Sequence, residues 1–598
     1  MRHLLQAFLL FGALTAVAQT ADDAIVISDA TDQYWPQTEA DGSVSFHNKV
    51  QTTFLAERMG GQVQADIYYG NTIQLDGSYA GLGNIAGHTT IEPHGVFFDD
   101  SRLCFYHLNL ARQGKKATAR FERTFTDSRF FNCVMLADER LIRHKQVKLT
   151  LPKGYHVLEH NMNDHISRSN YTDKQGRTVY CYTLTDQPAM RQEPLMPPVL
   201  KTSPCLLVLG AFQDVHDLYR WLHGLSAVDC SVPQADSLLR VISAGCTTSR
   251  QRAQATLQWV QQHISYVAYE AGLASHQPDT PAEVLRKRHG DCKGKALLLS
   301  TLLQAQGLDA HLTYIGTADI PWTPSEVPAL AAINHAVCTL FLDGDTLLLD
   351  PTARHLPLGC VPTVLQGREA LVEQGDTCLR YSVPMQAAPV DSLHYDVTLS
   401  GQQLHIQATA AWSGDVKELV LSTYDDTPTK DKAALAARWL NADDRHRQVD
   451  SCTWTATGNA APWATLSGTL TDTKAVMAMG SELYVELEPH NDLFALPIDT
   501  TRRTNDAELP FRCRIVRQVE LLVPQGYHVS SLPQGISLTT AQGVLSCSFT
   551  GQCGRVVMRK VMTLEQPLIR RQDIDAWNNA LRRWHDASSE LVVLKKDD

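Results

Sequence analysis

The stretch GDCKGKALLL, residues 290–299, decides how the centre of this chain folds. A Gly-Asp-Cys turn runs directly into an apolar pattern with helical spacing over residues 292–305. This pattern places Cys292 at or near the N-terminus of a helix, where the helix dipole and unpaired backbone N–H groups stabilise a thiolate. The stretch therefore predicts a nucleophilic cysteine on a helix whose stripe of Ala296, Leu299, Leu302 and Leu303 is buried.

A β-hairpin is predicted downstream of this helix. Residues 335–342 and 345–350 are apolar and β-prone, and they flank Asp343-Gly344, a strong hairpin signal. If these two residues form the loop, Leu342 pairs with Asp345. The register of the two strands then follows residue by residue.

This register brings His335 and Asp350 together. They become diagonal neighbours on one face of the hairpin, with Cβ atoms roughly 7–8 Å apart, whereas a slip of one residue would put them on opposite faces. Cys292, His335 and Asp350 have the chemistry of a nucleophile, a base and a group that orients the base. We therefore predict these three residues as a catalytic triad.

The residues that carry this prediction also carry a resemblance. Segment 249–355 resembles the transglutaminase-like superfamily of papain-type cysteine enzymes, and the nearest pattern is a bacterial exported family with a β-sandwich domain of unknown function on one side and a β domain on the other. One position departs, because relatives usually read GDCKDKA and this chain has Gly294 where the second Asp is expected. The matching stretches are 256–266, 277–278, 282–285, 290–293, 334–336 and 349–352.

The expected fold class is α+β multidomain. Length and composition suit about three or four domains, and short β-prone segments over 22–150 alternate with turns as in a β-sandwich. Helices are expected at 214–223, 234–244 and 249–263. The predicted organisation is a signal peptide (1–18), an N-terminal β-sandwich (22–235), a transglutaminase-like, papain-like core (236–385), a C-terminal β-sandwich (386–570) and a C-terminal helix or tail (571–598).

An internal repeat links the two flanking domains. The segment QVKLTLPKGYHV (146–157) closely matches QVELLVPQGYHV (518–529). A period near 370 residues is far too long for a solenoid. The repeat instead predicts that the flanking domains share a strand–turn–strand edge.

The N-terminus has the pattern of an export signal. A short basic start precedes an apolar run of about fourteen residues, which is too short for an ordinary membrane span, and an A-x-A motif ends at Ala18. We expect cleavage after Ala18, no later transmembrane segment, and a periplasmic or secreted protein.

The charge and the cysteine spacing bear on which partners and metals the protein binds. The net charge is −11, and no basic stripe is present, so nucleic acid is not expected. The 14 cysteines have irregular spacing with no zinc pattern, although Cys547 and Cys553 could pair across a hairpin. We expect no metal and no organic cofactor.

The predicted chemistry is acyl transfer through a thioester on Cys292. The leading interpretation is hydrolysis of a peptide, protein or cell-wall amide bond. The alternatives are a true cross-linking transglutaminase, and a non-catalytic cell-surface binding or assembly module, which Gly294 favours. Residues expected at the oxyanion site or substrate cleft are Gln277, Trp322, in the Pro-rich loop before His335, and Asp291.

Overall fold

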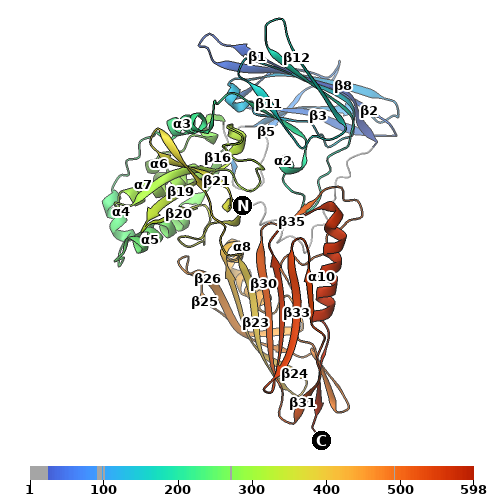
Figure 1. Ribbon diagram of the computed structural model, residues 1–598, viewed down its shortest axis with the longest axis vertical. Coiled ribbons are helices and arrows are strands. Elements are labelled where there is room, and N and C mark those ends of the chain that lie inside the picture. The colour runs from blue at the N-terminus through green and yellow to red at the C-terminus, as the bar shows by residue number, and fades with distance from the viewer. Residues whose placement is uncertain (1–23, 91–96, 99–100, 270–271, 490–491, 598) are drawn as a thin grey trace.

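The computed structural model describes residues 24–90, 97–98, 101–269, 272–489 and 492–597. An N-terminal β-rich region, an α+β core and a C-terminal β-rich region follow one another along the chain and occupy separate parts of the molecule (Figure 1). The predicted α+β multidomain fold is confirmed. The expected signal peptide lies outside the described residues. None of the helices in the described ranges has the length and apolar character that a bilayer span requires.

The N-terminal region is built from strands with alternating burial. A seven-stranded sheet has the order β12-β13-β10-β1-β2-β8-β4, and two three-stranded sheets have the orders β3-β7-β5 and β11-β14-β9. Alternate residues of these strands form one apolar core. The elements are β1 (Ile25–Thr38), β2 (Val44–Ala56), β3 (Gln62–Tyr69), β4 (Ile73–Tyr79), β5 (Gly87–Thr90), β6 (Phe97–Phe98), β7 (Arg102–Asn109), β8 (Lys116–Phe125), β9 (Cys133–Met135), β10 (Ile142–Leu151), β11 (His156–His160), β12 (Ile166–Thr172), β13 (Thr178–Gln187), α2 (Val199–Thr202) and β14 (Cys205–Leu209).

The core packs helices against a five-stranded antiparallel sheet of order β20-β19-β18-β21-β22. The predicted stripe of α7 is buried, and its leucines pack with Ala310 and Leu340 of the sheet. The elements are α3 (Val215–Ser226), α4 (Ala235–Ile242), α5 (Ser249–His263), β15 (Ser265–Tyr266), β16 (Ala268–Tyr269), α6 (Pro281–Lys287), β17 (His289–Gly290), α7 (Cys292–Gln304), β18 (Asp309–Ile315), β19 (His335–Leu342), β20 (Asp345–Leu349), β21 (Glu369–Gln374) and β22 (Thr377–Ser382).

Helix α3 belongs to the core by its packing. Its apolar face, with Leu218, Tyr219 and Leu222, is buried in one cluster with Leu297 of α7 and Leu312 of β18. The boundary predicted from the sequence, at residue 236, puts this helix in the N-terminal domain. We therefore propose that the core begins at α3 and not at residue 236.

The C-terminal region combines an eight-stranded sheet, of order β25-β26-β24-β23-β30-β34-β33-β32, with a four-stranded sheet, of order β27-β28-β36-β31. Helix α10 lies along the large sheet (Figure 1) and buries Trp577 and Trp584, while β36 joins the small sheet, so the expected C-terminal tail is part of the domain. Cys547 and Cys553 are both free, and their expected pairing is wrong. The elements are β23 (Val390–Ser400), β24 (Gln403–Ser413), α8 (Gly414–Asp426), α9 (Thr429–Leu440), β25 (Arg447–Ala456), β26 (Trp463–Asp472), β27 (Val476–Met479), β28 (Glu482–Val485), β29 (Ala507–Glu508), β30 (Cys513–Leu522), β31 (Tyr527–Ser531), β32 (Ile536–Thr539), β33 (Gly543–Gln552), β34 (Arg555–Leu564), β35 (Leu568–Ile569), α10 (Ile574–Ser588) and β36 (Val592–Lys596).

The internal repeat corresponds to a shared strand arrangement. Its two copies form β10 with β11 and β30 with β31. In each domain the first repeat strand pairs in parallel with the first strand of the domain, β10 with β1 and β30 with β23. The predicted shared edge is confirmed.

Candidate active site

Helix α7 begins at Cys292. Asp291 is the N-cap residue, and its carboxylate accepts the backbone N–H of Gly294 at 2.9 Å and pairs with the Lys293 ammonium. Buried Lys295 donates from Nζ to the carbonyl of Ile264 at 2.7 Å. These contacts fix the turn that presents Cys292.

The hairpin carrying His335 and Asp350 has the predicted register. Leu342 pairs with Asp345, and Asp343 and Gly344 in the loop have positive φ angles, as a two-residue type I′ turn requires. The Nε2 atom of His335 lies 3.0 Å from Oδ2 of Asp350. The structure therefore brings together the His and Asp that the sequence places 15 residues apart.

The electrostatics of this pair involve Cys292 as well. Burial alone lowers the pKa of a histidine, but the Asp350 carboxylate and the nearby Cys292 sulfur raise the pKa of His335 to about 10. Burial raises the pKa of a carboxyl, yet His335 and two donors from Thr352 hold the pKa of Asp350 below its usual value. Since Nε2 of His335 is bound to Asp350, Nδ1 is the ring atom left for the sulfur.

Two groups are candidates for binding an oxyanion: the backbone N–H of Cys292 and the side chain of Gln277. Within the described residues, no acceptor is bonded to the backbone N–H of Cys292, so this donor can serve an oxyanion. Gln277 is exposed, and its backbone N–H is bonded to the carbonyl of Leu273. Asp291 acts on the helix start and is only 6% exposed.

Trp322 is buried by packing. It is 5% exposed, its indole N–H donates to the carbonyl of Ala331 at 3.1 Å, and its ring meets His160 of the N-terminal domain edge-on. Trp322 thus packs against the apolar side chains of β14, and little of its ring is left to line a substrate cleft as the sequence predicts.

An aromatic group that sequence reasoning missed lies beside the start of α7. Phe130 of the N-terminal domain, Trp221 of α3 and His276 have ring centroids within 5.6–6.2 Å of one another. Phe130, Trp221 and Cys292 pack against the same apolar cluster. Burial and the nearby Lys293 ammonium lower the pKa of His276 to about 4, so this ring is neutral at pH 7.

Gly294 sits in a crowded position. A Cβ atom there would lie 3.1 Å from a methyl group of Val284, 3.6 Å from Oδ1 of Asp291 and 4.0 Å from Cβ of Asp279. An aspartate at this position would therefore meet two other acidic side chains. The space at this position therefore fits a glycine. Although Gly294 departs from the family pattern, His335 and Asp350 are still in contact.

The one metal-like cluster found among the described residues contains a lysine. Glu488, Asp492 and His585 have the spacing of metal ligands. However, Nζ of Lys560 pairs with Glu488, lies 2.7 Å from Asp492 and lies 3.2 Å from Nδ1 of His585. The ammonium occupies the position that an ion would take.

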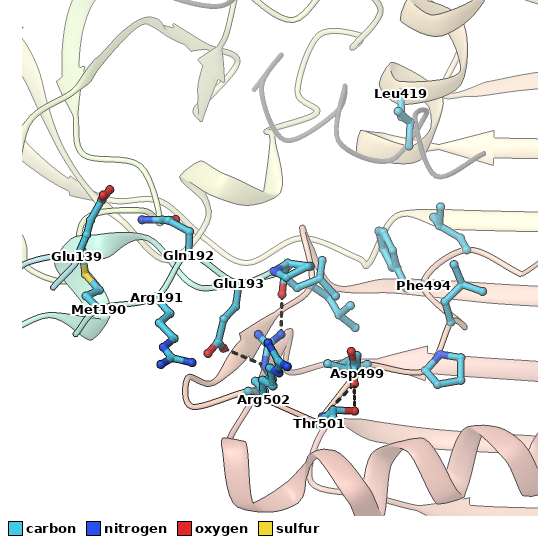
Figure 2. Close-up of a pocket in the computed structure, with 18 of the residues that line it drawn as sticks. Glu139, Met190, Arg191, Gln192, Glu193, Leu419, Phe494, Asp499, Thr501 and Arg502 are labelled. Carbon is cyan, nitrogen blue, oxygen red and sulfur yellow. Dashed lines mark hydrogen bonds and ion pairs between the residues drawn. The ribbon is translucent and has the colours of Figure 1, made fainter. Parts of the chain in front are cut away.

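A cleft of about 2560 Å³ lies between the N-terminal and C-terminal regions. Figure 2 shows part of it, with Met190 to Glu193 on one side and Phe494 to Arg502 on the other, and Leu419 of α8 also faces it. Neither Cys292 nor His335 is among the described residues that line this cleft. The cleft is therefore separate from the candidate triad.

Comparisons with known proteins place two parts of the chain in known domain families. Residues 236–346 match the transglutaminase-like superfamily, and residues 481–594 match DUF3858, a domain of unknown function with a solved structure. No curated protein matches the sequence. The chain thus carries a transglutaminase-like domain followed by a β-rich domain of unknown function, and the resemblance to the transglutaminase-like superfamily is confirmed.

Solved structures extend the comparison to the whole chain. A candidate protease from Parabacteroides distasonis has a TM-score of 0.58 at 11% identity, covering 96% of this chain and 100% of that one. The chain therefore shares the fold of that protein over nearly its full length. A candidate cysteine protease from Cytophaga hutchinsonii, at 13% identity over 53% of this chain and 78% of its own, has a TM-score of 0.16, which is too low to support an argument.

Proposed function

We propose that this protein is a cysteine acyl-transfer enzyme with Cys292 as nucleophile, His335 as base and Asp350 as the residue that orients His335. The observation that carries the proposal is the 3.0 Å contact between His335 and Asp350, with Cys292 at a helix N-terminus and near the same imidazole. We further propose that hydrolysis of a peptide or amide bond is the main reaction.

The mechanism has two half-reactions. The Cys292 thiolate attacks the carbonyl carbon, and the backbone N–H of Cys292 donates to the developing oxyanion. The C–N bond breaks as His335 gives its proton to the leaving amine, which leaves a thioester on Cys292. Water then attacks the thioester, His335 accepts a proton from it, and the thiolate leaves as the carboxylic acid forms. Asp350 stabilises the imidazolium throughout.

We also propose that the reaction takes place outside the cytoplasm. The apolar segment ending at Ala18 supports this location. An exported enzyme of this kind meets extracytoplasmic proteins, peptides and cell-wall amides, which are the substrates that we infer.

Acylation by p-nitrophenyl acetate tests the chemistry without a known substrate, because an accessible thiolate attacks this activated ester. We expect an acetyl thioester on Cys292, seen by peptide mass spectrometry, which water releases as acetate. Cys292→Ala should lose the acetylation, whereas Cys553→Ser, at an exposed free cysteine, should keep it.

The fate of the acetyl group separates the alternatives. Transfer to a fluorescent primary amine in preference to water would identify a transglutaminase. Absence of acetylation at Cys292 in folded protein would contradict the enzyme proposal and favour a binding module.

A further inference from the structure

The chain that follows Asp350 is held by the C-terminal domain. Thr352 donates its backbone N–H and its hydroxyl to Oδ1 of Asp350, at 2.8 and 2.6 Å. Two residues further on, the backbone N–H groups of Arg354 and His355 donate to Oε1 and Oε2 of Glu418, at 3.0 and 2.7 Å. Both oxygens of one carboxylate are thus bound to consecutive residues of the loop that starts at Asp350.

The Glu418 carboxylate is held in one orientation by its surroundings. It lies on α8, at the end of the C-terminal domain nearest the core (Figure 1), and is 5% exposed. Ser422, one turn later, donates to Oε1 of Glu418 at 2.9 Å. A buried carboxylate whose two oxygens accept three hydrogen bonds has little freedom to turn.

Side chains around Glu418 strengthen the attachment. The Arg354 guanidinium donates to the carbonyl of Ser422 at 2.9 Å and to Asp426 at 3.0 Å. Asn459 donates from Nδ2 to the carbonyl of Arg354. Residues of α8 and of the loop around Asn459 therefore bind both sides of the same short segment.

We propose that Glu418 is a positioning residue for the triad: through the backbone of residues 352–355 it holds the Asp350 carboxylate against His335. The C-terminal domain then supplies a residue that positions the triad. This inference rests on the proposed function. The competing explanation is that Thr352 alone fixes Asp350 and that Glu418 only joins two domains.

The test compares Cys292 alkylation by iodoacetate and by neutral iodoacetamide from pH 5 to 11. An imidazolium next to the sulfur attracts the iodoacetate anion, so the ratio of the two rates falls as His335 loses its proton. Asp350 and Cys292 are the groups that raise the pKa of His335, and they place this loss near pH 10. In Asp350→Asn the fall should occur at a pH lower by one unit or more.

Glu418→Ala should shift the ratio in the same direction as Asp350→Asn. Glu418→Gln, which keeps one acceptor oxygen, should lie between Glu418→Ala and wild type, and it serves as the second variant if Glu418→Ala does not fold. Arg512→Met is the matched control, since Arg512 joins the same two domains through Gln366, at 2.6 Å, outside the segment 352–355 that Glu418 binds. It should keep the wild-type profile.

The outcomes distinguish the two claims. Folded Glu418 variants with the wild-type profile, beside a shifted Asp350→Asn, would overturn the role of Glu418 and leave the triad standing. If the pH at which the rate ratio falls shifts equally in Arg512→Met and in Glu418→Ala, Glu418 only joins the two domains. A wild-type protein without reactive Cys292 at low pH would overturn the proposed function itself.

Discussion

Replacing Asp350 by asparagine is expected to slow turnover of p-nitrophenyl acetate by on the order of 10³-fold. An amide carries no charge, so it cannot stabilise the imidazolium, and it can hold the ring in the wrong tautomer. The pKa of His335, which Asp350 helps to raise to about 10, should fall toward its ordinary value. Steady-state release of p-nitrophenol measures the effect.

A matched variant on the same hairpin provides the control. Asp345→Asn changes the same side-chain type at the start of β20, where the carboxylate is exposed, and should leave turnover unchanged. An Asp350→Asn protein that turns over like the wild type would mean that Asp350 only caps the turn through Thr352.

Replacing Lys560 by methionine is expected to destabilise the C-terminal domain by about 3–5 kcal/mol. The ammonium lies between Glu488 and Asp492, whose side chains are both fully buried, and its removal takes the lysine partner from both carboxylates and leaves Asp492 paired with Arg517 alone. Burial raises the pKa of a carboxyl, yet His585, Lys560 and Ser589 hold the pKa of Glu488 at about 2, so this group is charged in the folded protein.

Urea unfolding followed by tryptophan fluorescence measures this loss, because the ring of Trp584 lies 4.2 Å from Nζ of Lys560. Arg555→Met, on the same strand β34, breaks an exposed pair with Glu520 and should cost only about 0–1 kcal/mol. Equal unfolding midpoints for Lys560→Met and wild type would show that the cluster tolerates the loss of its cation.

Local patterns in the sequence were enough to predict the centre of the site. The Asp343-Gly344 turn fixes the register, and the period of two then sets which side chains share a face. The helical spacing after Cys292 predicted α7 for the same reason. These features depend on interactions between residues close in sequence, or across one hairpin.

Features that depend on packing between domains were not predictable in this way. Trp322 was expected at a cleft because it precedes His335, but β14 of another domain covers it. Phe130, from the N-terminal domain, and Glu418, from the C-terminal domain, reach the site over more than 60 residues of sequence, and neither occurs in a local motif. Only the three-dimensional arrangement of the domains reveals them.

The central claim is that His335 keeps Cys292 in a reactive, ion-paired form, and the rate of Cys292 alkylation by iodoacetamide from pH 4 to 9 tests it most directly. An ordinary thiol with a pKa near 8.5 is only about 0.3% ionised at pH 6. We expect wild-type Cys292 to react at pH 6 about a hundredfold faster than in His335→Ala. An ordinary thiol profile for Cys292 that His335→Ala leaves unchanged would contradict the account.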